Sequence, residues 1–123
     1  MALHGERILI VEDETLIALS LASEITELGG NVVGKVMSVD SALDIIATTD
    51  LDGAILDVNL GGQRAFLVAD ALAARHVPFV FATATSREDI PARHANVPWF
   101  EKPYGFDAIC QMLEGMCSRN SGE

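Results

Sequence analysis

Short apolar runs alternate with helix-patterned segments along the whole chain, and this alternation limits most strongly how the chain can fold. The first run, at residues 8–11, has no polar interruption, which is typical of a strand buried on both faces. Residues 15–28 then place apolar side chains at a helical repeat, and Gly29 and Gly30 end that helix. A strand, a helix and a second strand in this order predict parallel strands joined by helical crossovers.

The rest of the chain continues this pattern with one exception. Further strands are predicted at residues 31–36, 54–57, 78–82 and 98–100, and further helices at residues 39–46, 65–72 and 106–117. The exception is residues 86–97, where Pro91 and a scarcity of apolar side chains favour a single turn or a distorted helix. The predicted fold class is therefore α/β, a (βα)5 flavodoxin-like, doubly wound sheet of five parallel strands with a short or distorted fourth helix.

The length and the composition fit one globular domain without nucleic-acid or membrane partners. We expect a single domain over residues 1–123, with a core at about 7–117 and a polar, fraying tail at 118–123. Half of the residues are apolar, which excludes intrinsic disorder. With 8 basic and 18 acidic residues the net charge is −10, and binding to nucleic acid or to anionic membranes would need a basic patch instead.

The chain also lacks the marks of export. No apolar run approaches the ~18 residues of a membrane span, and the first residues contain no signal-peptide core. Cys110 and Cys117 are too few for a disulfide framework and share the apolar stripe of the last predicted helix, so we interpret them as buried thiols. These features favour a reduced, cytoplasmic setting.

Charged and polar side chains follow the predicted strands at the edge where such sheets bind ligands, beyond the strand carboxyl ends. They are Glu12, Asp13 and Glu14 after the first strand, Asp57 at the end of the third, Thr83 after the fourth and Lys102 after the fifth. Glu12, Asp13 and Asp57 carry three negative charges against one positive charge on Lys102. The remainder of −2 is the charge that a divalent ion would cancel, and oxygen ligands at a shallow surface suit Mg²⁺.

This ordered set resembles the receiver domain of bacterial response regulators. The residues that carry the resemblance are Glu12-Asp13, Asp57, Thr83-Ala84 and Lys102-Pro103, in this order along a (βα)5 pattern. Residues 57–62 are also similar to the family's loop around the phosphoacceptor. The resemblance covers nearly the whole chain, and each piece is weak by itself, since Glu12-Asp13 could begin a helix and Thr83 could cap one.

The resemblance implies a phosphorylation-dependent switch of a two-component phosphorelay. Asp57 would accept a phosphoryl group from a phosphohistidine on a sensor histidine kinase or a histidine phosphotransfer protein. The resemblance implies that Mg²⁺ is bound by Glu12, Asp13, Asp57 and the backbone carbonyl of Asn59. Lys102 and Thr83 would contact phosphoryl oxygens, and Trp99 would be the aromatic ring that switches position. Asn59 and Thr85 would tune the rate of dephosphorylation. Only self-phosphotransfer and slow self-dephosphorylation follow, not an enzyme that acts on outside substrates.

Three other functions are compatible with an α/β fold of this kind, and the residues at the strand ends disfavour each of them. A flavodoxin-like nucleotide binder would need a Gly/Ser/Thr-rich loop after the first strand, where the chain has three acids. A hydrolase of the aspartyl-phosphate type would need a second aspartate two residues after Asp57, where Asn59 stands. The remaining alternative is a pseudo-receiver, an interaction module that is never phosphorylated, which the full set of competent site residues disfavours.

The surface of the first predicted helix could contact a partner. Leu16 and Leu19 lie off its core stripe and could form an apolar edge for the kinase or for a second copy of the chain in a homodimer; ordinary surface leucines are the simpler interpretation. A stand-alone receiver and a fragment of a larger regulator or hybrid kinase both fit the sequence, and a start at Met1 modestly favours the first.

Overall fold

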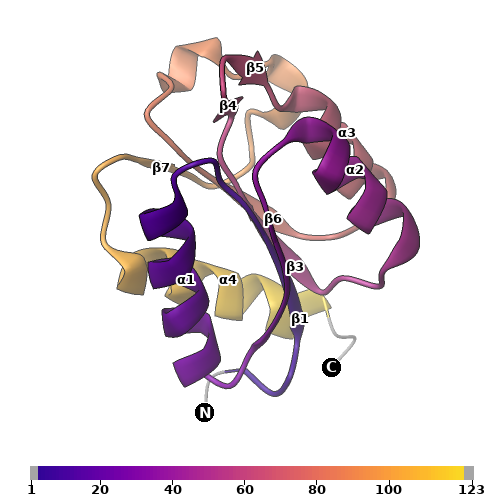
Figure 1. The fold of residues 1–123 in the computed structure, drawn as a ribbon, viewed down its shortest axis with the longest axis vertical. Helices are drawn as coiled ribbons and strands as arrows, with labels where there is room; N and C mark the ends of the chain where they lie inside the picture. The colour runs from indigo at the N-terminus through magenta and orange to yellow at the C-terminus, as the bar shows by residue number, and fades with distance from the viewer. Residues whose placement is uncertain (1–2, 121–123) are drawn as a thin grey trace.

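The computed structural model describes residues 3–120, which form a parallel sheet covered by helices on both faces (Figure 1). The strand order is β2-β1-β3-β6-β7, with all neighbours parallel. The strands are β1 (Arg7–Val11), β2 (Asn31–Val36), β3 (Gly53–Leu56), β6 (Phe79–Thr83) and β7 (Trp99–Glu101). The helices are α1 (Thr15–Glu27), α2 (Val39–Thr48), α3 (Phe66–Ala74) and α4 (Phe106–Asn120). The predicted α/β fold class is confirmed.

Two apolar layers form because successive side chains of a strand point to opposite faces of the sheet. On β1, Ile8 and Ile10 pack with side chains of α1 and α4, whereas Leu9 and Val11 pack with those of α2 and α3. Figure 1 shows α1 and α4 together on one side of the strands and α2 and α3 on the other. Burial on both faces explains the apolar runs of β1, β3 and β6, whereas β2 at the edge of the sheet is only partly buried and contains Lys35.

A small hairpin follows β3 and was not predicted. Strands β4 (Asn59–Leu60) and β5 (Gln63–Arg64) pair antiparallel. Gly61 and Gly62 connect them with φ angles of 58° and 88°. Positive φ at both central residues is typical of a type I′ turn and favours glycine. The two glycines at the end of the 57–62 segment therefore form the tip of a hairpin.

The segment around Pro91 contains two 3-10 turns in place of a fourth long helix. They are η1 (Arg87–Asp89) and η2 (Ala92–His94), with Pro91 between them. Asp70 of α3 anchors η2, since its carboxylate accepts hydrogen bonds from Arg93 and lies 2.8 Å from His94 Nε2. The His94 ring is buried edge-on against Phe79 and Phe81. The prediction of a single turn or a distorted helix agrees with this irregular segment.

The last helix is longer than its apolar stripe. Helix α4 continues to Asn120, so residues 118–120 of the predicted fraying tail are helical, while residues 121–123 lie outside the described residues. Cys110 and Cys117 are buried as expected, and burial raises the pKa of both thiols to about 12, which leaves them protonated at neutral pH. Within residues 3–120, no helix combines the length and the apolar character that a membrane crossing requires.

Candidate functional site

The carboxyl ends of β1 and β3 bring four acidic side chains together. Glu12 and Asp57 each directly follow their strand, and the backbone N–H of Asp57 donates to the carbonyl of Val11 at 2.9 Å, which keeps the two strand ends in register. One carboxylate oxygen from each of four residues lies within 4.8 Å of the others: Glu12, Asp13, Glu14 and Asp57. Like charges at this separation repel unless cations compensate them.

Lys102 supplies one such cation from the end of β7. Its Nζ lies 2.9 Å from Asp57 Oδ2, 3.0 Å from Glu12 Oε1 and 2.6 Å from Glu14 Oε1. Burial opposes the charged form of this side chain, but the three carboxylates outweigh it and raise the pKa of Lys102 above its ordinary value. The ammonium is therefore charged at neutral pH.

Glu12 is the most deeply buried of the acids, with 2% of its surface exposed. Burial raises its pKa to about 7, although the backbone N–H of Glu14 and the Lys102 ammonium favour its ionised form. A carboxyl with such a pKa binds a proton near neutral pH. A cation that approaches the cluster would displace this proton.

Backbone amides orient two of the carboxylates. Asp57 Oδ1 accepts a hydrogen bond from the N–H of Asn59 at 3.1 Å, and Asp13 Oδ2 accepts one from the N–H of Gly61 at 2.9 Å. The second bond joins the tip of the β4–β5 hairpin to the loop after β1. The hairpin therefore helps to hold Asp13 in place, which is a role that the sequence analysis did not anticipate.

The loop after β6 faces the same acids. The Thr83 side chain is fully buried, and its Oγ1 accepts a hydrogen bond from the N–H of Thr85 at 3.1 Å. Thr85 in turn accepts a hydrogen bond through its backbone carbonyl from Trp99 Nε1 at 3.2 Å. Trp99 is half-buried at the start of β7, so one chain of contacts joins Thr83, Thr85 and Trp99.

A hollow of about 320 Å³ lies between these elements. Its lining combines acidic, hydroxyl and amide side chains with one ammonium group: Asp13, Glu14, Asp57, Asn59, Thr83, Ala84, Thr85 and Lys102. Carboxylate oxygens at the floor are ligands that Mg²⁺ prefers, and the open mouth leaves room for the waters that it retains. The residues present therefore fit a hydrated Mg²⁺ ion.

A family model of the response regulator receiver domain matches residues 8–114, which is most of the chain. This chain belongs to that family. The predicted resemblance is thus confirmed, and with it the assignment to two-component signalling. The receiver domain family is a class of signalling switches, not of enzymes in the ordinary sense.

Curated proteins and solved structures resemble this receiver domain over most of its length. The transcriptional regulatory protein PdtaR of Mycobacterium tuberculosis is 28% identical over 117 residues, which cover 92% of this chain but 57% of PdtaR. The chain thus spans little more than half the length of that curated relative. A solution structure of SdrG from Sphingomonas melonis Fr1 is 43% identical, covers 94% of this chain and 98% of SdrG, and superposes with a TM-score of 0.78.

Two further solved structures superpose on this chain. The BeF3-activated conformation of SdrG covers 90% of this chain and 95% of its own, at 43% identity and a TM-score of 0.73. The receiver domain of the sensor histidine kinase PA1611 from Pseudomonas aeruginosa PAO1 is described with a magnesium ion coordinated in its active-site cleft. It is 20% identical, covers 93% of this chain and 98% of its own with a TM-score of 0.78, and at that identity it shows the fold alone.

The receiver domain brings all the predicted site residues to one edge of the sheet. The charged cluster is formed by Glu12, Asp13, Asp57 and Lys102. The hollow beside it is also lined by Asn59, Thr83 and Thr85, and Trp99 is connected to it through its hydrogen bond to the Thr85 carbonyl. The contact of Glu14 with Lys102 was not predicted, although the run of three acids after β1 was a signal for it. Leu16 and Leu19 are exposed on α1, at 80% and 49%.

Proposed function

We propose that this receiver domain is a phosphorylation-dependent switch of a phosphorelay and that Asp57 is its phosphoacceptor. The observation that carries the proposal is the place of Asp57 in the cluster. Its carboxylate lines the hollow, lies 2.9 Å from the Lys102 ammonium and is fixed by the N–H of Asn59. A nucleophile held beside a cation in a pocket open to solvent is what phosphoryl transfer requires.

In a phosphorelay the donor of this transfer is a phosphorylated histidine on the partner. An oxygen of the Asp57 carboxylate forms a new bond to phosphorus while the bond from phosphorus to the donor's imidazole nitrogen breaks. The electron pair of the broken bond stays on the imidazole. Lys102 offsets the negative charge of the phosphoryl oxygens, and catalysis consists of positioning and charge compensation.

Glu12, Asp13, Asp57 and the backbone carbonyl of Asn59 would hold Mg²⁺, which when bound neutralises charge on the phosphoryl oxygens. The four-carboxylate cluster of residues 12–14 and 57 supports this assignment. Gly61 keeps Asp13 oriented toward the site through its backbone N–H. Glu12 enters the ligand set in its ionised form, so its proton must leave first.

The conformational change would begin at Thr83. Its hydroxyl oxygen accepts a hydrogen bond from the Thr85 N–H, and rotation of the hydroxyl hydrogen toward a phosphoryl oxygen would draw the loop inward. Because Thr85 also bonds to the indole of Trp99, movement of this loop would pull on the ring. Asn59 and Thr85 line the hollow and would tune the rate at which water removes the phosphoryl group from Asp57.

The proposed partners are a sensor histidine kinase or a histidine phosphotransfer protein. Exposed Leu16 and Leu19 of α1 are candidates for contact with that partner or with a second copy in a homodimer. We further propose that residues 1–123 form a single domain in the cytoplasm, and the net charge of −10 makes nucleic acid and anionic membranes poor partners. The BeF3-activated conformation of SdrG supports a switch in this chain by similarity.

Acetyl phosphate with Mg²⁺ provides the test. We expect the intact wild-type chain to gain the mass of one phosphoryl group, Asp57→Asn to gain none, and a chelator to prevent the gain in the wild type. Equal labelling of Asp57→Asn would contradict the assignment. No labelling of a folded wild-type chain would instead favour the pseudo-receiver alternative.

A further inference from the structure

We propose that Glu14 is a displaceable partner of Lys102 that slows phosphorylation of Asp57. This inference rests on the proposed function. Neither the family resemblance nor the charge count of the site assigns a role to Glu14. Its contact with Lys102 Nζ, at 2.6 Å, is nevertheless the shortest of the three that the ammonium makes to carboxylates.

The Lys102 ammonium has no N–H to spare. It carries three N–H groups, and each can serve one of its three carboxylate partners, Glu12, Glu14 and Asp57. Lys102 can therefore turn toward a phosphoryl oxygen only if it gives up one of these contacts. Each carboxylate that holds the ammonium in its present position competes with the incoming group.

Of the three carboxylates, Glu14 can give up its contact with Lys102 at the smallest cost in free energy. The side chains of Glu12 and Asp57 are only 2% and 5% exposed, so neither can exchange the ammonium for water. The side chain of Glu14 is 58% exposed, and water can take over the contact. Glu14 and Lys102 also border a second hollow of about 390 Å³ beside Tyr104, which leaves room for the carboxylate to swing away.

The negative charge of Glu14 has opposite effects on the two ligands of the site, the phosphoryl donor and Mg²⁺. Its side chain lines the hollow that an anionic phosphoryl donor must enter, so it repels the donor while it occupies Lys102. The same charge attracts Mg²⁺. As the bond from Asp57 to phosphorus forms and the bond to the donor breaks with its electron pair, Lys102 exchanges Glu14 for a phosphoryl oxygen.

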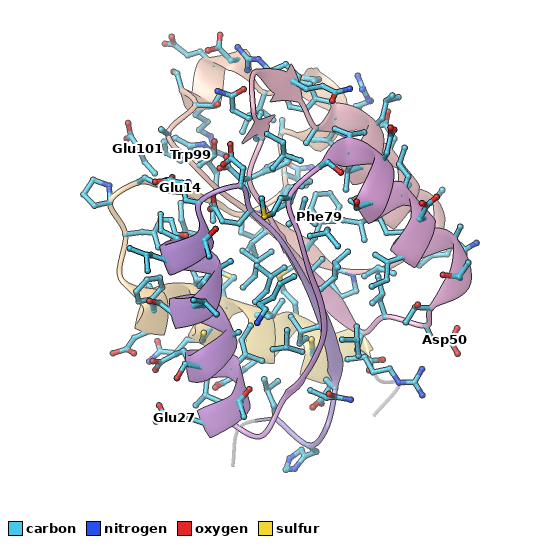
Figure 2. The ribbon with its side chains drawn as sticks, viewed as in Figure 1. Glu14, Glu27, Asp50, Phe79, Trp99 and Glu101 are labelled. Atoms are coloured by element: carbon cyan, nitrogen blue, oxygen red, sulfur yellow. The ribbon has the colours of Figure 1, made fainter. Side chains whose placement is uncertain are left out.

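The test compares Glu14→Gln with two further variants. Glu27→Gln removes the same charge from the other end of α1, as Figure 2 shows, and controls for net charge. Glu14→Asp keeps the charge but is one methylene too short to keep the 2.6 Å contact. Mg²⁺ affinity is measured by calorimetry, and the labelling rate with acetyl phosphate at saturating Mg²⁺ by mass spectrometry of the intact chain.

We expect Glu14→Gln to label about twofold to fivefold faster than wild type and to bind Mg²⁺ more weakly by a similar factor, the range of one exposed ion pair. Glu14→Asp should also label faster, with nearly unchanged Mg²⁺ affinity, and Glu27→Gln should match wild type. Labelling of Glu14→Gln at or below the wild-type rate, or of Glu14→Asp at the wild-type rate, would overturn the inference. A wild-type chain that takes no label on Asp57 would overturn the proposed function itself, and this inference with it.

Discussion

The Nζ of Lys102 lies 2.9 Å from Oδ2 of Asp57, although 45 positions separate the two residues in the sequence. Asp57 follows β3 and Lys102 follows β7, with β6 between them in the sheet. Only a long side chain can reach across an intervening strand end. The fold thus places a cation beside the proposed nucleophile by using the parallel alignment of three strands.

Replacing Lys102 with methionine tests two effects of its charge: compensation of the phosphoryl oxygens and competition with Mg²⁺ for the carboxylates. Lys102→Met keeps the length of the side chain but removes the charge. We expect labelling by acetyl phosphate to fall by about a hundredfold, since the phosphoryl oxygens lose a fixed cation. Mg²⁺ should bind more tightly because its competitor for the carboxylates is gone, and the metal-free chain should lose on the order of 2 kcal/mol of stability. Calorimetry and urea denaturation measure the last two effects, and labelling at the wild-type rate would rule out the role of Lys102.

Much of this arrangement follows from patterns that are local in the sequence. The short apolar runs and the helical repeats predict the order of elements, and the carboxyl ends of the strands predict that Asp57 and Lys102 converge. The predicted strand at 31–36 coincides with β2. The predicted strands span three to six residues, and burial selects their apolar side chains directly.

The parts that were missed depend on shorter or longer-range features. Strands β4 and β5 have two residues each, which is too short for any periodicity to show. Burial of His94 follows from its meeting with Asp70, Phe79 and Phe81, which no local pattern encodes. The contact between Glu14 and Lys102 depends on side-chain conformations that the sequence does not specify.

Thr83 should couple phosphorylation to the movement of Trp99. In Thr83→Ala the Asp57 carboxylate and its cation remain, so we expect labelling to persist. The loop can no longer be drawn toward the phosphoryl group, so the fluorescence change of Trp99, which is the chain's one tryptophan, should be lost. Thr48→Ala, which removes an exposed hydroxyl from α2, is the matched control. A full fluorescence response in Thr83→Ala would show that the coupling runs through other residues.

The elevated pKa of Glu12 predicts how stability depends on pH. Burial raises this pKa from 4.5 to about 7, so between these values the folded chain binds more protons than the unfolded chain. The Glu12 contribution to the stability of the metal-free protein should therefore be present at low pH and should be lost as pH rises from 4.5 through 7. Comparing the free energies of unfolding of wild type and Glu12→Gln at several pH values isolates the pH-dependent contribution of Glu12. Parallel pH profiles for the two proteins would contradict it.

Gly53 permits close packing of β3 against α4 below the site. A Cβ at this position would lie 3.0 Å from both Cys117 Sγ and Leu113 Cδ1, which is closer than side chains normally approach. We expect Gly53→Ala to lower the free energy of unfolding by about 1–3 kcal/mol through overpacking. Gly105→Ala is the control, because a Cβ there would meet no atom within 4 Å. Equal stability of the two variants would mean that the helix shifts at little cost.

The most direct measurement locates the phosphoryl group itself. The wild-type chain is treated with acetyl phosphate and Mg²⁺ and then with borohydride, which reduces an aspartyl phosphate to homoserine, and its peptides are sequenced by mass spectrometry. We expect homoserine at position 57 and at no other aspartate. Homoserine at another position, or an unmodified Asp57 in a chain that has gained the phosphoryl mass, would contradict it.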